Sequence, residues 1–198
     1  MTDRKFSPVL AVLAVCALLA GAACEMKMAD ESYAPIEFTE MAPLPVNVAR
    51  IEVIERFKPP LSAPHIEHLV PVPPSHALRN WARDRMVARG RGGVARFIIV
   101  DASVIQEPLK TTEGLKGLIT TDQAARYSVT LKARVEMENA TGQGFAEAAA
   151  TRSRTVPEDT SLAEREKILH AMIGATSKDL DKELERNIRA HLGGFILN

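Results

Sequence analysis

Residues 126–138 alternate strictly between apolar and polar side chains, and this alternation restricts the possible fold more than any other feature of the chain. The apolar positions are Tyr127, Val129, Leu131, Ala133, Val135 and Met137. Successive side chains of a β-strand point to opposite faces of its sheet, so the pattern predicts a strand that is buried on one face only. Other elements of the chain must therefore cover one face of the sheet, and the second face is left polar.

Three further segments are predicted to be strands. Residues 46–57 and 94–105 carry apolar side chains at both odd and even positions, as strands inside a sheet do. Residues 145–156 follow the alternating strand after a short loop with two glycines, an arrangement typical of a β-hairpin. We expect residues 94–105 to lie at the centre of the sheet.

Two helices are predicted on either side of these strands. The first spans residues 75–89 and stops at Gly90. The second begins at a capping box, in which Ser161 and Glu164 satisfy free main-chain N–H groups. Its apolar residues then recur every four positions, at Leu180, Leu184, Ile188 and Leu192. Such a helix is longer than a small sheet requires, so a bend or break is expected near residues 174–177.

The expected order of elements is therefore β-α-β-β-β-α. The fold class is α+β, with two helices packed on one face of a four-stranded mixed sheet, because the alternating strand offers only one apolar face. Residues 46–198 are expected to form this single α+β domain. Six prolines between residues 58 and 74 exclude both helix and regular strand, so an extended crossing is expected there.

The N-terminal residues have the layout of a secretory signal peptide. Arg4 and Lys5 are followed by an apolar run and then by the small residues that precede Cys24. A cysteine in this position resembles the bacterial lipobox, although Gly21 stands where that motif usually has leucine. We expect a lipoprotein signal peptide at residues 1–23, acylation (palmitate) of Cys24, and a flexible tether at residues 24–45. Plain secretion and a retained N-terminal anchor are the alternatives.

The composition agrees with export and excludes several chemistries. Cys16 is the only cysteine besides Cys24, and cleavage would remove it, so thiol catalysis and thiolate metal sites are not expected. A net charge of zero argues against a nucleic-acid partner. His65 and His68 lie on the proline-rich crossing, where solvated histidines are favoured over a metal site. No catalytic residue, metal or cofactor is expected.

Basic residues are the candidate binding groups. The set that we expect to contact an anionic partner is Lys132, Arg134, Arg152, Arg154, Arg85 and Arg89. Pairing Phe145 opposite Met137 would place Arg152 and Arg154 on the polar face with Lys132. A shift by one residue would turn both arginines toward the helices. The first register is favoured because it directs Phe145 into the core.

A lipidated cysteine, a proline-bearing tether and a compact domain that ends in a long charged helix together resemble the small envelope lipoproteins of Gram-negative bacteria. In layout the chain is similar to the LPS-assembly lipoprotein, which supports an outer-membrane barrel, and to the ABC-type transport auxiliary lipoproteins of lipid-trafficking systems. At the level of residues, the resemblance consists of the lipobox at Cys24.

This resemblance implies a non-enzymatic lipoprotein that faces the periplasm and acts as a binding or assembly module in envelope lipid or LPS transport. The implied partners are the membrane, a barrel or transporter component, and an anionic lipid or LPS. A periplasmic small-ligand carrier or an enzyme of unknown reaction is the alternative. Glu25 follows the cysteine in place of the aspartate typical of inner-membrane retention, which favours the outer membrane.

Overall fold

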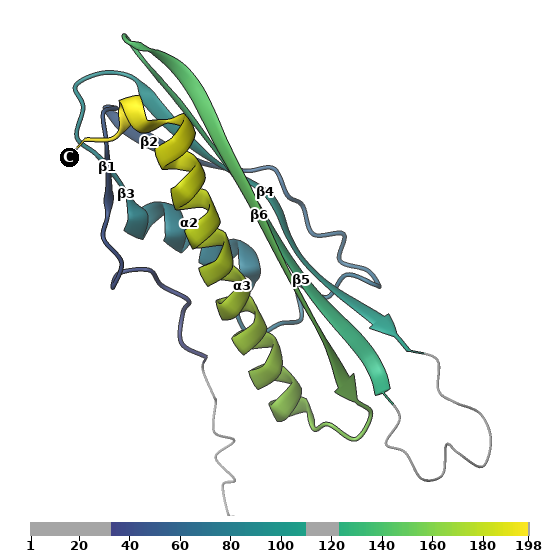
Figure 1. Ribbon diagram of the computed structural model, residues 1–198. Coiled ribbons are helices and arrows are strands. Elements are labelled where there is room, and N and C mark those ends of the chain that lie inside the picture. The colour runs from purple at the N-terminus through teal and green to yellow at the C-terminus, as the bar shows by residue number, and fades with distance from the viewer. Residues whose placement is uncertain (1–32, 110–122, 198) are drawn as a thin grey trace, which may run out of the picture. The chain divides into compact units, whose positions relative to one another are not determined.

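The computed structural model describes residues 33–109 and 123–197 (Figure 1). The predicted signal peptide, Cys24 and the first part of the predicted tether lie outside these residues. The elements follow the order β1 (Leu44–Val46), β2 (Arg50–Glu55), α2 (Pro74–Arg85), β3 (Met86–Ala88), β4 (Val94–Pro108), β5 (Gln123–Asn139), β6 (Gly142–Pro157), α3 (Leu162–His191) and the 3-10 helix η1 (Gly193–Phe195).

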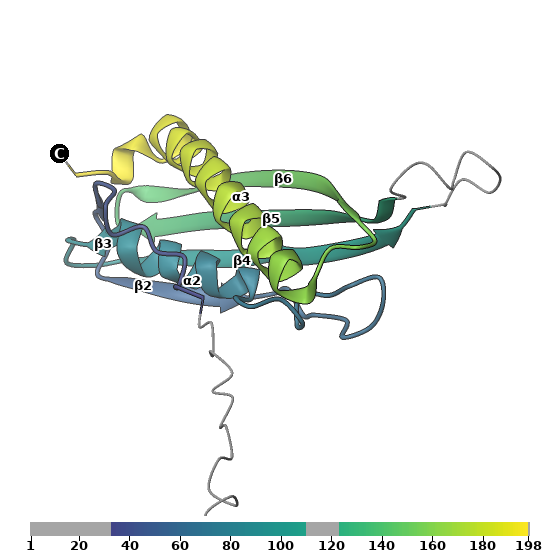
Figure 2. The same ribbon diagram turned by 90° about the horizontal axis from the view of Figure 1, so that it is seen from below.

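The main sheet has four strands in the order β2-β4-β5-β6. Strand β2 runs parallel to β4, whereas β4, β5 and β6 pair antiparallel, so the sheet is mixed. Both helices lie on the same face of this sheet, and α3 runs obliquely across the strands (Figure 2). The predicted α+β fold is confirmed, with β4 inside the sheet as expected.

Strand β5 shows why one face of the sheet is covered. Its apolar positions from Tyr127 to Met137 are all buried, with at most 2% of their surface exposed. Strand β6 adds the small side chains of Ala146 and Ala148 to the core where α3 packs, and Val156 near its end. Small residues let the helix approach the sheet closely, so the large apolar residues of α3 can reach the row provided by β5.

Helix α3 is one continuous element of 30 residues, and the break expected near residues 174–177 is wrong. Its capping box is formed as predicted, with the Ser161 hydroxyl accepting a hydrogen bond from the Glu164 N–H at 3.2 Å. Thr176 and Ser177 are buried, so the helix stays packed through the stretch in question. Strands β4, β5 and β6 have 15 to 17 residues each, and this unusual length supports a long helix.

The region before the main sheet differs from the expected single strand. Residues 46–57 are divided between β1 and β2, and β1 pairs in parallel with β3, which occupies the predicted last turn of the first helix. Phe38, inside the predicted tether, is 3% exposed, and its N–H donates to the Asp84 carboxylate at 3.0 Å. The described part of that segment therefore packs on the domain.

The proline-rich crossing covers the edge of β4 beyond the end of β2. The Ile66 N–H donates to the Val104 carbonyl at 2.8 Å, and the Gln106 N–H donates to the Pro64 carbonyl at 2.9 Å. Prolines leave few N–H groups for such pairing, but these bonds suffice to satisfy the β4 main chain where no strand lies beside it.

Candidate functional site

The register of the β5–β6 hairpin decides which basic residues share a face. Phe145 lies opposite Glu136, and Gly144 lies opposite Met137, so the favoured register is wrong by one residue. A tight turn closed by Asn139 and Gly142 sets this pairing. The Leu192 side chain packs in the core beside Gly144. A Cβ atom added at residue 144 would lie 2.9 Å from that side chain. Phe145 is consequently 51% exposed on the polar face.

Lys132 and Arg134 lie on the polar face as predicted, but carboxylates accompany them. The Arg134 Nε donates to Glu136 at 2.8 Å, and Glu147 lies 3.8 Å from both Arg134 and Lys132. The Arg134 guanidinium also stacks 3.7 Å from the centre of the Phe145 ring. These cations are therefore already engaged within the sheet, which weakens their attraction for an outside anion.

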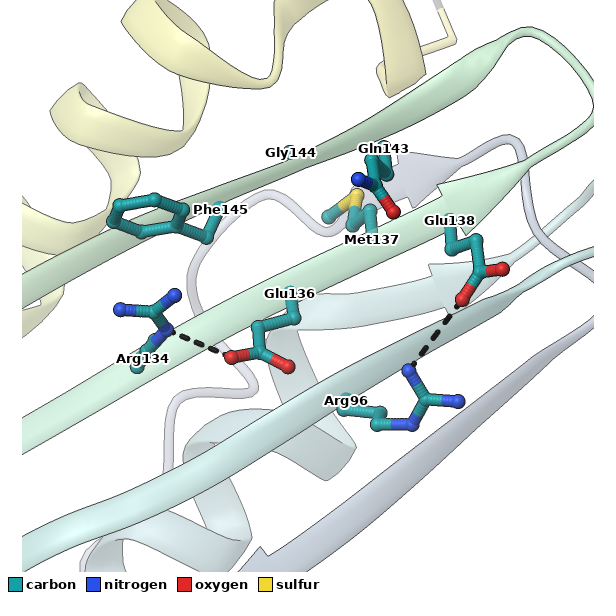
Figure 3. A pocket seen from close by; sticks show the side chains of 8 residues that line it. All are labelled: Arg96, Arg134, Glu136, Met137, Glu138, Gln143, Gly144 and Phe145. Carbon is teal, nitrogen blue, oxygen red and sulfur yellow. Dashed lines mark hydrogen bonds and ion pairs between the residues drawn. The ribbon is translucent and has the colours of Figure 1, made fainter.

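A shallow hollow of about 410 Å³ opens on this polar face (Figure 3). Phe145 and Arg134 form one side of it, and Arg96 forms the other with Glu138, 3.7 Å away. Its lining combines positive and negative side chains in about equal number, so it does not select a ligand of either charge.

Arg152 and Arg154 lie on the same face of the sheet as α3. The register that was not favoured predicted this position. The Arg152 Nε donates to Asp179 of α3 at 2.6 Å. This hydrogen bond raises the pKa of Arg152 and lowers that of Asp179, so the pair stays charged at neutral pH. Arg154 makes no ion pair with any described residue.

A second hollow, of about 350 Å³, lies between these arginines and α3. The helix contributes an apolar floor that includes Ile168 and Met172. Arg152 is already paired with Asp179, but Arg154 beside this apolar floor can bind a group that carries both an anionic and an apolar part. We name this hollow, together with Arg152 and Arg154, the helix-side groove.

Arg85, also in the predicted binding set, lies inside the protein. Its side chain is 2% exposed, and its Nε donates to Asp181 at 2.9 Å. Two further hydrogen bonds reach Glu185 and the carbonyl of Ala42. The Trp81 indole N–H donates to the same Asp181 oxygen at 2.7 Å. Arg85 is therefore a core residue that is not available to an outside anion.

The surroundings of Glu185 favour its ionised form. Burial raises the pKa of Glu185, but the hydrogen bond from Arg189 and the charges of Arg85 and Arg189 outweigh burial, so the pKa is lowered overall. Arg85 was predicted to bind an anionic partner, although its spacing places it inside or beside the apolar arc of the first helix. That spacing was the signal that it faces inward.

The remaining predicted residues are not gathered into a site. Arg89 follows β3, where its main-chain N–H donates to the Val46 carbonyl at 2.9 Å. His65 Nδ1 lies 3.6 Å from the buried carboxylate of Glu67. Both residues belong to the proline-rich crossing, which is distant in sequence from the β5–β6 hairpin. Within residues 33–109 and 123–197, no group of three or more potential ligands could hold a metal ion. No helix in the same part of the chain is long and apolar enough to cross a membrane.

Comparison with known proteins gives only distant structural similarity. No family model matches the sequence, and no curated protein matches it. The crystal structure of rare lipoprotein B from Shewanella oneidensis is 13% identical, covering 69% of this chain and 92% of that chain with a TM-score of 0.37. The minor lipoprotein from Acinetobacter baumannii is 11% identical, covering 72% and 95% respectively with a TM-score of 0.35. At this level of similarity the comparisons assign the chain to no family.

Proposed function

We propose that the protein is a non-enzymatic lipoprotein, anchored through acylated Cys24 and facing the periplasm, that serves as a binding or assembly module in envelope lipid or LPS transport. The observation that carries this proposal is the position of Cys24. It directly follows a signal-like segment, and no other cysteine occurs after it. Glu25 favours the outer membrane as the site of the anchor.

A contact of Tyr33 with helix α3 limits how far the domain can lie from the membrane. The Tyr33 ring lies 5.2 Å from the His170 ring of α3, and Tyr33 is nine positions after Cys24. Nine residues span at most about 30 Å, even when fully extended. The domain thus acts close to the bilayer surface or to a protein embedded in it. The helix-side groove supplies Arg154 for a phosphate or carboxylate of such a partner.

Changing Cys24 to serine tests the anchor. Serine cannot form the thioether that carries the lipid, so Cys24→Ser is expected to abolish incorporation of labelled palmitate and to move the protein from the membrane to the soluble fraction. Cys16→Ser is the matched control and should keep both the label and the membrane location. Full labelling of Cys24→Ser, or its retention in membranes, would refute the proposal.

A further inference from the structure

Strand β6 is an edge strand whose outer side pairs with no other strand in the described part of the chain. It is the last strand of the sheet and has 16 residues. In an antiparallel pair, alternate residues direct their main-chain groups toward the neighbouring strand. The carbonyl of Glu147 accepts a hydrogen bond from the Asn187 side chain at 2.8 Å, on the side away from β5. By the same alternation, Ala149, Thr151, Ser153 and Thr155 direct their N–H and C=O groups outward.

This edge is open and regular from residue 149 to residue 155. All residues from Thr151 to Thr155 are exposed, whereas Ala146 and Ala148 are buried beneath α3. The pairing of β6 with β5 is continuous from the pair Ala125 and Val156 to the pair Asn139 and Gly142, so no bulge interrupts it. Natural sheets protect such edges with bulges, prolines or a covering segment. The β4 edge has a covering segment, and β6 has none among the described residues.

The charges beside the edge identify the kind of strand that fits. Side chains of an added strand would alternate between the polar face and the helix-side groove. On the groove side they would meet Arg154, which has no described ion-pair partner, and the apolar surface of Ile168 and Met172. Acidic side chains interspersed with apolar ones complement these neighbours.

A second copy of the chain would meet like charges in one register of pairing at this edge. Antiparallel pairing of two β6 strands centred on Ser153 would set Arg152 of each copy opposite Arg154 of the other. Like charges directly opposite each other destabilise a sheet. The arginines thus disfavour self-association in this register, whereas a strand of opposite charge meets no such repulsion.

We propose that the outer edge of β6, from Ala149 to Thr155, receives an extended acidic segment of another envelope protein, which adds to the sheet as a fifth strand. This inference rests on the proposed function for the location of the partner, but the contact is defined by this chain alone. Main-chain hydrogen bonds supply the affinity, and Arg154 supplies the selectivity.

A synthetic peptide tests the contact on the full chain. The probe is a fluorescent peptide of about eight residues. Threonine occupies every second position, and glutamate and valine alternate at the other positions, so that both reach the groove side. Binding is measured by anisotropy. Methylating alternate main-chain nitrogens of the peptide removes its donors, which should weaken binding at least tenfold. Arg154→Glu should weaken binding at least tenfold too, and a lysine–valine peptide should then bind this variant better than the original peptide does.

A matched pair of variants tests the strand edge. Ser153→Pro removes one outward N–H, and an edge strand tolerates proline at such a position. Ser153→Ala keeps that N–H, while both variants lose the hydroxyl contact with Ser128 at 2.8 Å. Ser153→Pro should bind the peptide at least tenfold more weakly, and Ser153→Ala should bind it like the natural chain. If circular dichroism shows that Ser153→Pro is unfolded, the methylated peptide decides.

Three results would overturn the inference. The methylated peptide could bind the natural chain as well as its parent, which would reduce the contact to charge alone. The chain could ignore the peptide and instead bind LPS or phosphatidylglycerol vesicles, with binding lost when Lys132, Arg134, Arg152 and Arg154 are changed to glutamate. It could also dimerise through β6. None of these results alters palmitate labelling of Cys24, so the proposed anchor is judged separately.

Discussion

Replacing Arg85 with alanine is expected to lower the free energy of unfolding by about 3–5 kcal/mol, because it leaves a buried carboxylate without its partner. The side chains of Arg85 and Asp181 are 2% and 5% exposed, so water cannot take the place of the guanidinium. Arg85→Ala also opens a cavity beside Trp81. Urea denaturation monitored by tryptophan fluorescence measures the loss, since Trp81 is the only tryptophan.

A double replacement separates charge from packing. Arg85→Met with Asp181→Leu removes both charges and keeps the volume, so it should restore much of the stability lost in Arg85→Ala. A deficit of about 1–3 kcal/mol is expected to remain, because the Trp81 N–H loses its acceptor. If Arg85→Ala unfolds at the same urea concentration as the natural chain, the cluster contributes no net stability and this view of the core is wrong.

Changing Leu184 to aspartate should be equally damaging for a different reason. Leu184 is fully buried where α3 meets the sheet, so the new carboxylate would be removed from water. A cost of about 3 kcal/mol or more is expected, enough to unfold a domain of ordinary stability at physiological temperature. Thermal unfolding followed by circular dichroism measures the change.

Ala190→Asp places the same group on the exposed side of the same helix. It should change stability by less than about 1 kcal/mol. If Leu184→Asp melts like the natural chain while Ala190→Asp does not, the assignment of the buried face of α3 is reversed.

The main features of the fold follow from residue patterns that act locally. Strict alternation from Tyr127 to Met137 identifies a one-sided strand, and the capping box at Ser161 identifies the start of α3. Both signals depend only on neighbouring residues, so one sequence suffices to interpret them. The continuity of α3 could not be obtained in this way, since it depends on how long the supporting strands are.

The candidate site was less predictable because it depends on contacts between distant residues. Placing Phe145 in the core is reasonable on hydrophobicity alone, but the tight turn at residues 139–142 and the side chain of Leu192 require Gly144 at the inward position. This shift of the register by one residue places Arg152 and Arg154 on the helix side of the sheet instead of the polar face. Arg85 was predicted to bind an outside anion but is buried. Its partner Asp181 lies 96 positions away in sequence, so no local pattern could reveal the pair.

The central claim is that a tethered domain holds an envelope partner at the β6 edge, and thiol crosslinking in living cells tests it most directly. The proposed processing would acylate Cys24 and remove Cys16, so Ser153→Cys would then supply the only free thiol. Arg50→Cys, on the opposite edge strand β2, is the matched control, since Arg50 is also exposed. A short thiol-to-amine crosslinker should join Ser153→Cys to one discrete protein and leave Arg50→Cys unjoined. The same adducts from both positions, or none from Ser153→Cys in membranes that contain the lipidated protein, would contradict the claim.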